Sequence, residues 1–327
     1  MPDDQNTISI IYGQFSAVFK PEAPLRLPFY TGSMFRGAFG SALKHAVCVT
    51  RTYDCETCLL KHRCLYPYIF ETPPPPNSRV MRKYTSAPHP FVFEPPPGGV
   101  TAPEARPLVV GVTLFGKAIS SLSHFVFALE QLGQRGLGAR RVRCVLSTVD
   151  GHLDGHQWTL YSAEDRVPRS ADAFERLFHL PLRPAAASFE TSPTERVKVE
   201  ILTPLRVRYE SRLVATLPFH VFFRSLLRRI AHLSYFHCGG DSSRLAFREW
   251  IERASSVEII EQELKWFDWN RYSNRQQTAM SMGGLIGHVT FAGKLAPFYP
   301  FLKAGEIVHA GKGTSFGLGR FRVVRCN

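Results

Sequence analysis

The chain has 327 residues, 44% of them hydrophobic, and carries a formal net charge of +13 at pH 7. This content is enough for packed cores in one large or two ordinary domains, and it excludes a disordered chain. The basic residues are mostly arginine, which favours a polyanionic partner, with nucleic acid first.

No targeting or membrane segment is expected. The first ten residues, MPDDQNTISI, are polar and acidic, unlike a signal peptide. The most apolar stretch, residues 107–129, is interrupted by Lys117, His124 and several serines, so it does not predict a membrane span. We therefore expect a cytoplasmic protein with no membrane partner.

The first half of the chain alternates strands, helices and loops. Alternating apolar and polar residues predict a strand over 7–21, and apolar residues at helical spacing predict a helix over 34–48. A Cys-rich insert and two proline clusters follow, which indicate loops. A strand over 106–116, a helix over 120–133 and a strand over 139–151 complete this half.

Residues 163–195, rich in Pro, Ala, Ser and charge, indicate a domain boundary, so we predict an N-terminal domain over 1–185 and a C-terminal domain over 186–327. The second half predicts the order strand, helix, strand, strand, helix, strand, over residues 196–209, 217–236, 257–269, 281–293, 296–311 and 320–324. This order is that of the ferredoxin-like unit, a four-stranded antiparallel sheet with helices on one face.

The first half has the same order in a less regular form. The predicted fold is therefore α+β, with two tandem ferredoxin-like (RRM-like) domains. A Cys-rich insert over 48–64 interrupts the first domain, and a glycine-rich loop over 311–319 lies in the second.

Four glycines near the C-terminus, in GKGTSFGLGRFRV, fit neither common nucleotide motif. Lys312 precedes Gly313, which is the wrong order for a phosphate loop, and Phe316 occupies the third glycine position of the dinucleotide fingerprint. The stretch also leads into a strand instead of a helix. The glycines therefore predict a loop whose backbone approaches a ligand closely, flanked by Lys312, Arg320, Arg322 and Arg325.

This motif, with LIGHVTFAGKLAPFYPFLKAGEIVHA before it, resembles the CRISPR-associated precursor-crRNA processing endoribonucleases of the RAMP superfamily. GSMFRGAFGSALKHAVC, CETCLLKHRCLYPYIFETP and PHPFVFEPPP in the first half resemble the same family. The resemblance implies tandem ferredoxin-like domains and a glycine loop that lies against RNA. It also implies binding of CRISPR repeat RNA and one metal-independent cut that leaves a 2′,3′-cyclic phosphate.

The implied partners are CRISPR repeat RNA, precursor crRNA and CRISPR effector subunits, with the protein acting as a monomer or homodimer. The resemblance also implies a general acid/base histidine, usually in the N-terminal domain, whose position varies across the family. A non-catalytic RAMP subunit that binds crRNA in an effector complex is the alternative from another class. A metal-dependent nuclease is disfavoured, because no Asp/Glu cluster is evident in the sequence.

Cleavage by an internal 2′-hydroxyl needs a base, an acid and cations near the phosphate, and histidine suits the proton steps. His45 lies roughly 80–100° from the apolar stripe of its helix, where a side chain can face a cleft. It is therefore the first catalytic candidate, with Tyr30 to orient the hydroxyl and Lys44 to contact the phosphate. His309 is the runner-up, although packing under the loop is its favoured role. For His45, Tyr30 and Lys44 a packing or solvated role stays open.

Basic residues on both halves are candidates for RNA contact. On the helix over 217–236 they form an edge that His232 and His237 help to extend, and on the first helix Arg36 shares the exposed side. The predicted RNA-binding residues are Arg36, Arg224, Arg228, Arg229, Gly311, Lys312, Gly313, Gly317, Gly319, Arg320 and Arg322.

Four cysteines with the spacing C-x6-C-x2-C-x5-C, namely Cys48, Cys55, Cys58 and Cys64, predict a structural zinc site. Four thiolates leave no open position for catalysis, so the metal is interpreted as structural, and the resemblance implies that no cofactor takes part in the reaction itself. Free thiols, a disulfide and an iron–sulfur cluster are the alternatives, and His62 could replace one cysteine. The other three cysteines, Cys144, Cys238 and Cys326, have no metal-site spacing.

Overall fold

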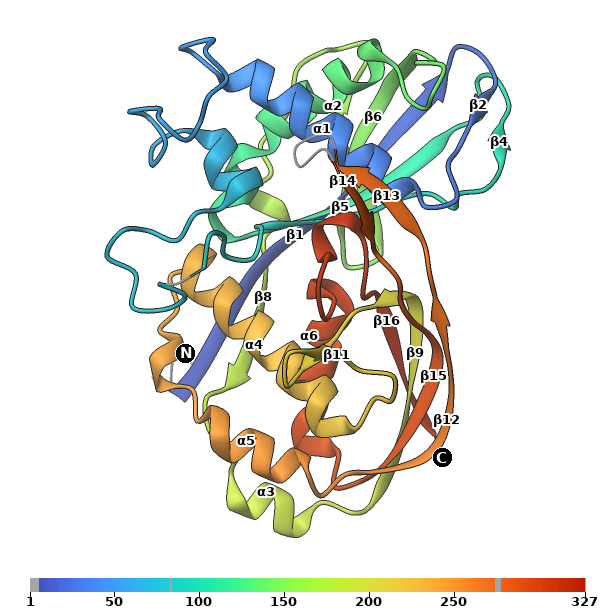
Figure 1. Ribbon diagram of the computed structural model, residues 1–327. Helices are drawn as coiled ribbons and strands as arrows, with labels where there is room; N and C mark the ends of the chain where they lie inside the picture. The colour runs from blue at the N-terminus through green and yellow to red at the C-terminus, as the bar shows by residue number, and fades with distance from the viewer. Residues whose placement is uncertain (1–5, 83, 274–277, 327) are drawn as a thin grey trace. The chain divides into compact units, whose positions relative to one another are not determined.

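The computed structural model describes residues 6–82, 84–273 and 278–326. The chain divides into two compact units (Figure 1). The N-terminal unit comprises Ile11–Leu177 and Phe236–Cys238, and the C-terminal unit comprises the chain up to Ile10, Phe178–Tyr235 and the residues from Gly239 onward. Within the described residues no helix is long and apolar enough to cross a membrane.

The N-terminal unit contains a ferredoxin-like sheet. Its main elements are β1 (Thr7–Pro21, which continues into the other unit), α1 (Thr31–Val47), β3 (Phe91–Glu94), β5 (Leu108–Phe115), α2 (Leu122–Arg135), β6 (Cys144–Leu153) and β7 (His156–Ser162). The strand order is β3-β5-β1-β6-β7, and these strands pair antiparallel. Without β7, this is the strand order of a ferredoxin-like unit, which confirms the predicted fold class here.

The C-terminal unit repeats the arrangement. It contains β9 (Glu195–Leu205), α4 (Phe219–His237), α5 (Phe247–Ala254), β12 (Glu258–Phe267), β15 (Gly284–Gly293), α6 (Tyr299–Val308) and β16 (Phe321–Cys326). The sheet order is β12-β15-β9-β16, again antiparallel, so the predicted order of strands and helices is confirmed in this unit as well.

Shorter elements decorate these sheets. They are β2 (Leu25–Arg26) with β4 (Thr101–Ala102), a π-helical turn η2 (Pro67–Glu71), β8 (Arg176–Pro181), α3 (Ala186–Thr191), β10 (Arg208–Tyr209) with β11 (Arg212–Leu213), and β13 (Asn270–Ser273) with β14 (Thr278–Ser281).

Each unit has an aromatic core. In the N-terminal unit Phe39 of α1 packs its ring against those of Phe91, Phe93 and Phe125, at centroid distances of 5.9, 5.2 and 4.8 Å. In the C-terminal unit the buried phenylalanines of α4 pack against α5 and α6, through Phe219, Phe223, Trp250, Phe298 and Phe301. Aromatic pairs of this kind add to the stabilisation that their buried area provides.

Two elements were not predicted from the sequence. The proline-flanked segment that contains β3 was expected to be irregular, yet β3 supplies an edge strand beside β5. The helix α5 is short and strongly amphipathic, with Trp250 and Ala254 as its buried residues. Short elements of this kind have too few residues to show a period, and tertiary packing decides their conformation.

Candidate functional site

His45 lies in the last turn of α1, on the exposed side of the helix. Its Nδ1 is 2.7 Å from the carbonyl oxygen of Ser41. Because a carbonyl oxygen can only accept, Nδ1 carries the proton and donates it to this bond. In the neutral ring the lone pair is then on Nε2, the nitrogen that a proton-transfer reaction can use.

Two residues that were not predicted from the sequence contact the His45 ring. The phenol ring of Tyr53 lies 4.5 Å from the imidazole, centroid to centroid. The Nη1 of Arg135, from the end of α2, lies 3.4 Å from His45 Nδ1. Arg135 thus places a cation beside the imidazole, and its position depends on how α1 and α2 pack. No local sequence signal links residues that far apart in the chain.

Tyr30 and Lys44 do not join His45. Tyr30 is the N-cap of α1, and His45 is in the last turn, so about 20 Å of helix separates them. Burial raises the pKa of the Tyr30 phenol, which opposes a role in proton transfer. The ammonium of Lys44 lies 5.3 Å from the Tyr66 ring and lines a cavity among the cysteines of the insert. The predicted grouping of Tyr30 with His45 is therefore wrong.

Arg36 participates in a network inside the N-terminal unit. Its Nη2 donates to His89 Nε2 over 3.0 Å, and its guanidinium lies 4.2 Å from the centre of the Phe70 ring. The other ring nitrogen of His89 lies 2.8 Å from the hydroxyl of Thr72. These contacts give Arg36 a structural role that the predicted RNA contact did not include.

The glycine-rich loop packs on its own unit. Residues 314–319 are buried, and a Cβ on Gly319 would overlap the carbonyl oxygen of Ala310. A Cβ on Gly311 would lie 2.5 Å from the carbonyl oxygen of Arg206. The predicted RNA contact is therefore wrong for Gly317 and Gly319, because their surroundings are protein. Gly311 and Gly313 are partly exposed and stand on either side of Lys312.

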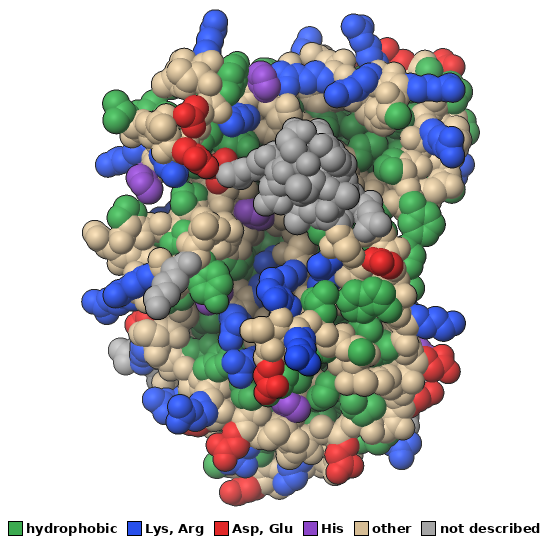
Figure 2. All heavy atoms as spheres, in the orientation of Figure 1, with side chains coloured by type: hydrophobic (Ala, Val, Ile, Leu, Met, Phe, Trp, Pro, Cys, Tyr) green, Lys and Arg blue, Asp and Glu red, His purple; other side chains and the backbone are tan. Residues whose placement is uncertain are grey.

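Lys312 lies at the exposed tip of this loop, where its backbone N–H donates to the carbonyl oxygen of Arg206 over 2.9 Å. Partial burial, and then the charges of Arg208 and Arg206, lower the pKa of the Lys312 ammonium. Three cations close enough to repel one another favour an anion between them. Figure 2 shows one face of the molecule, on which Lys and Arg side chains gather in several places. Lys312 is among the residues predicted from the sequence, whereas Arg206 and Arg208 are not.

Only part of the predicted basic edge of α4 is exposed to solvent. Arg228 is exposed and Arg224 half-exposed, with the Arg224 guanidinium 5.8 Å from the centre of the Tyr209 ring. Arg229 is buried, and its Nε donates to the carbonyl oxygen of Val308 over 2.5 Å. The predicted RNA contact of Arg229 is wrong, because the period of the helix turns this side chain toward α6.

The three histidines near this edge are buried or half-buried. His237 is buried, and its Nε2 lies 2.8 Å from the carbonyl oxygen of Pro88. Burial lowers the pKa of His232 to about 4, with a further contribution from Arg228 and Arg229. His309 is buried at the end of α6, and its Nδ1 lies 3.2 Å from the carbonyl oxygen of Leu318. These contacts place the His309 side chain beneath the glycine-rich loop.

The basic residues of the last strand differ in their surroundings. Both Nε and Nη2 of Arg322 donate to one carboxylate oxygen of Glu200, over 2.8 and 2.6 Å. The Arg325 guanidinium lies 3.9 Å from the centre of the Tyr299 ring. Arg320 is exposed, and its backbone N–H donates to the Thr203 hydroxyl. Lys312, Arg320, Arg322 and Arg325 are all exposed, and Arg322 and Arg325 differ from the others in these contacts with Glu200 and Tyr299.

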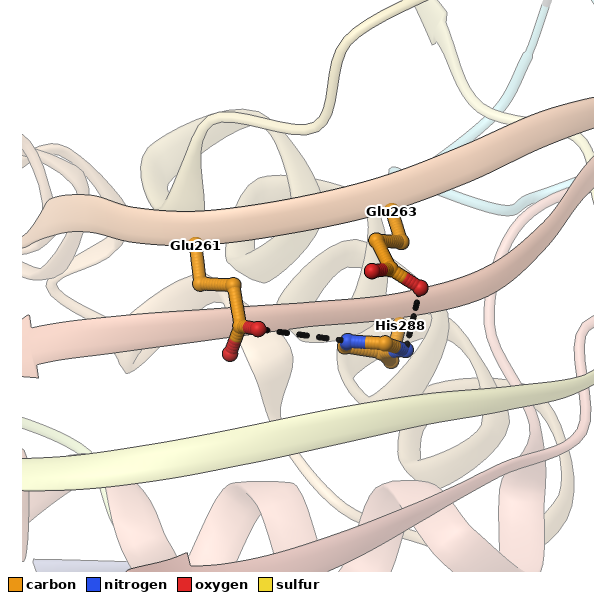
Figure 3. A group of neighbouring side chains, drawn as sticks. All are labelled: Glu261, Glu263 and His288. Atoms are coloured by element: carbon orange, nitrogen blue, oxygen red, sulfur yellow. Dashed lines mark ion pairs between the residues drawn. The ribbon is translucent and has the colours of Figure 1, made fainter.

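A group of acidic residues that was not predicted from the sequence lies on the C-terminal sheet (Figure 3). Glu261 and Glu263 alternate on β12, so both side chains are on the face that also carries His288 of β15. The two ring nitrogens of His288 lie 3.9 and 4.0 Å from the two carboxylates. Both glutamates are exposed, and the geometry is that of a surface ion-pair network.

Comparisons with known proteins match both halves of the chain. A family model described as the CRISPR-associated endoribonuclease Cas6 matches residues 199–321, and a second model, described as an N-terminal domain, matches residues 10–173. A protein of Archaeoglobus fulgidus, described as uncharacterized, is 26% identical over 301 residues, which are 91% of this chain and 92% of that protein.

Solved structures show the same fold. A Cas6 product complex matches with a TM-score of 0.55 and 15% identity, over 96% of this chain and 100% of that chain. A partial Cas6-RT-Cas1–Cas2 complex matches with a TM-score of 0.53 and 14% identity, over 97% of this chain and 46% of that chain. Residues 199–321 therefore form a domain of the CRISPR-associated Cas6 family, and the chain as a whole has the ferredoxin-like fold of solved Cas6 structures.

Proposed function

We propose that the protein is an endoribonuclease that binds CRISPR repeat RNA and cleaves precursor crRNA through attack of a 2′-hydroxyl on the neighbouring phosphate. The attack forms the bond from O2′ to phosphorus and breaks the bond to O5′, which leaves a 2′,3′-cyclic phosphate and a 5′-hydroxyl. No metal ion takes part in these steps. The observation that carries the proposal is the exposed His45 ring, whose Nδ1–H is bound to Ser41.

His45 is the proposed general acid/base. With Nδ1 as the donor to Ser41, Nε2 has a lone pair that accepts the proton of the 2′-hydroxyl, or returns a proton to O5′. The guanidinium of Arg135 beside the ring supplies positive charge near the crowded phosphate. Tyr53 packs on the imidazole and limits its rotation. A histidine with a firm orientation and an accessible nitrogen is suited to proton transfer.

Binding of the RNA is assigned in the C-terminal unit to the group of Lys312, Arg206 and Arg208, with Arg320 on the same loop. Lys312 and Arg208 are exposed and Arg206 half-exposed, which suits contacts to phosphate. The buried part of the glycine-rich loop supports the backbone that carries Lys312.

The test is incubation of the full chain in EDTA with the repeat RNA of the array nearest to its gene. We expect one cut and a cyclic phosphate on the upstream product, and no cut in RNA with a 2′-deoxy group at that position. His45→Ala should lower the single-turnover rate about 10²–10⁴-fold and leave RNA affinity nearly unchanged. His124→Ala, an exposed histidine on α2 of the same unit, is the matched control.

Other outcomes separate the competing functions. Tight binding without any cut of the cognate repeat would assign the protein to the non-catalytic RAMP subunits that bind crRNA. Cleavage that requires an added divalent cation would contradict the metal-independent mechanism. An unchanged rate in His45→Ala would remove His45 from the reaction.

A further inference from the structure

All four cysteines of the insert line one small cavity in the N-terminal unit. Cys48, Cys55, Cys58 and Cys64 are among its lining residues, and the cavity has a volume of about 20 Å³. A space of this size holds one ion or one water molecule. His62, the alternative ligand, is exposed and does not line the cavity.

The four cysteines come from distinct points of the chain. Cys48 caps the C-terminal end of α1, and its N–H donates to the Lys44 carbonyl oxygen over 3.1 Å. Cys55 and Cys58 belong to a C-x-x-C segment, and the Cys64 carbonyl oxygen accepts the Tyr68 N–H at the start of η2. Cys55 and Cys64 also pack against the core of the unit. A ligand held by all four would join the end of α1 to the start of η2.

We propose that this cavity binds one Zn²⁺ through the four cysteine sulfurs. Binding deprotonates the thiols and releases four protons, so that the ion and its four thiolates carry a net charge of −2. The side chains of Lys44 and Lys61 line the same cavity and offset this charge, while Asp54 adds one negative charge. A single ion needs less rearrangement of this cavity than an iron–sulfur cluster, which needs room for several irons and sulfides.

Binding requires the thiols to move closer together. Glu261, Glu263 and His288 form the one group of three or more possible ligands, among the described residues, whose ligand atoms all lie within 4.8 Å of one another. No three of the four cysteine sulfurs are therefore this close together. Sulfurs bound at about 2.3 Å in a tetrahedron lie about 3.8 Å apart. Residues 49–63 form bends, turns and irregular stretches and contain no helix or strand, so small backbone and side-chain rotations can close the site.

The ion has a structural consequence for the His45 ring. Tyr53, which packs on His45, lies between Cys48 and Cys55 in the chain, and its φ is 54°. Ligation of both flanking cysteines ties the two ends of the loop that carries Tyr53 to one ion. This restraint limits the movement of the phenol ring. The zinc is thus a structural ion that orders the insert beside His45, and its binding does not depend on whether the RNA is cut.

The experiment measures zinc in the full chain, purified under reducing conditions, by mass spectrometry of the metal. We expect about one Zn²⁺ per chain, and a tetrahedral thiolate spectrum when Co²⁺ replaces it. All seven cysteines are free thiols in the structure, so zinc should protect four of them from a thiol reagent. Cys55→Ser and Cys58→Ser should lower zinc affinity at least about 100-fold, and Cys326→Ser should not.

Less than about one fifth of an equivalent of zinc, both as purified and after addition of Zn²⁺, would overturn the proposal. Equal reactivity of all accessible thiols with and without Zn²⁺ would do the same. Because both are measured on the unmodified chain, misfolding of a serine variant does not affect either result. Zinc content measured in the EDTA-treated cleavage sample shows whether lost activity reflects the structural ion or the proposed chemistry.

Discussion

The Nδ1–H of His45 donates to the carbonyl oxygen of Ser41, one helical turn earlier, over 2.7 Å. This bond requires a proton on Nδ1, because the carbonyl oxygen can only accept, and the Arg135 guanidinium therefore cannot donate to the same nitrogen while the bond is made. The same nitrogen is 3.4 Å from the Arg135 guanidinium, and the ring packs on Tyr53. The end of α1, the end of α2 and the Cys-rich insert therefore converge on one histidine.

The first prediction concerns Arg135. Arg135→Ala should lower the single-turnover cleavage rate about 10–100-fold, because a cation beside the reacting phosphate is lost. Arg135→Lys should recover part of the rate, since a point charge replaces the planar fork. The measurement is cleavage at saturating protein together with RNA affinity by filter binding.

Arg140→Ala is the control for Arg135. Arg140 is exposed and lies just beyond the end of α2, so its substitution removes the same charge from the same unit. Equal effects of the two substitutions on cleavage would show that Arg135 acts only through general electrostatic attraction of RNA.

The order of strands and helices could be predicted from the sequence because apolar periodicity records which face each element buries. The strand β1 and the helix α1 show this clearly, with Phe35 and Phe39 on the buried face of α1. The candidates Lys312 and His45 also came from the sequence, and both are exposed, as contact with a ligand requires.

The remaining site residues depend on tertiary packing. Arg135 contacts His45 across 90 residues of sequence, and no local pattern records this pairing. Arg229 has the sequence context of a basic surface, yet it is buried while its neighbour Arg228 is exposed. The pairing of β12 with β15 brings Glu261 and Glu263 to His288. Predicting this group from the sequence would have required the register of the two strands.

The second prediction concerns the cation group at the tip of the glycine-rich loop. Lys312→Ala should weaken binding of repeat RNA several-fold at moderate salt. It should also reduce the slope of log affinity against log salt by about 1, because one phosphate contact is lost. Arg248→Ala, an exposed arginine on α5 of the same unit, is the charge-matched control. An identical slope for Lys312→Ala and the unmodified chain would place the RNA elsewhere.

The third prediction concerns the support of that loop. Gly319 has a φ of 72°, and an added Cβ would overlap the Ala310 carbonyl oxygen. Gly319→Ala should therefore lower the free energy of unfolding by more than Gly239→Ala, which has a similar φ of 74° and nothing within 4 Å of the added Cβ. We expect about 1 kcal/mol for Gly239→Ala and at least about 1 kcal/mol more for Gly319→Ala.

Urea unfolding of the two glycine variants gives the comparison. Equal losses would mean that the backbone conformation alone, and not the contact with Ala310, makes glycine necessary at 319. A separate measurement of RNA affinity, on the folded Gly319→Ala protein, shows whether the loop geometry also positions Lys312.

The last prediction concerns acid sensitivity. Burial, with smaller contributions from Arg228 and Arg229, lowers the pKa of His232 to about 4. The unfolded chain then binds more protons than the folded one as the pH falls from about 6.5 to about 4, so the folded state loses stability over this window. The shift corresponds to at most about 3 kcal/mol. His232→Gln should flatten the dependence of the free energy of unfolding on pH, and His179→Gln, an exposed histidine of the same unit, should not. The measurement is urea unfolding at about pH 7 and about pH 4.5, and parallel curves for His232→Gln and the unmodified chain would mean that another group is responsible.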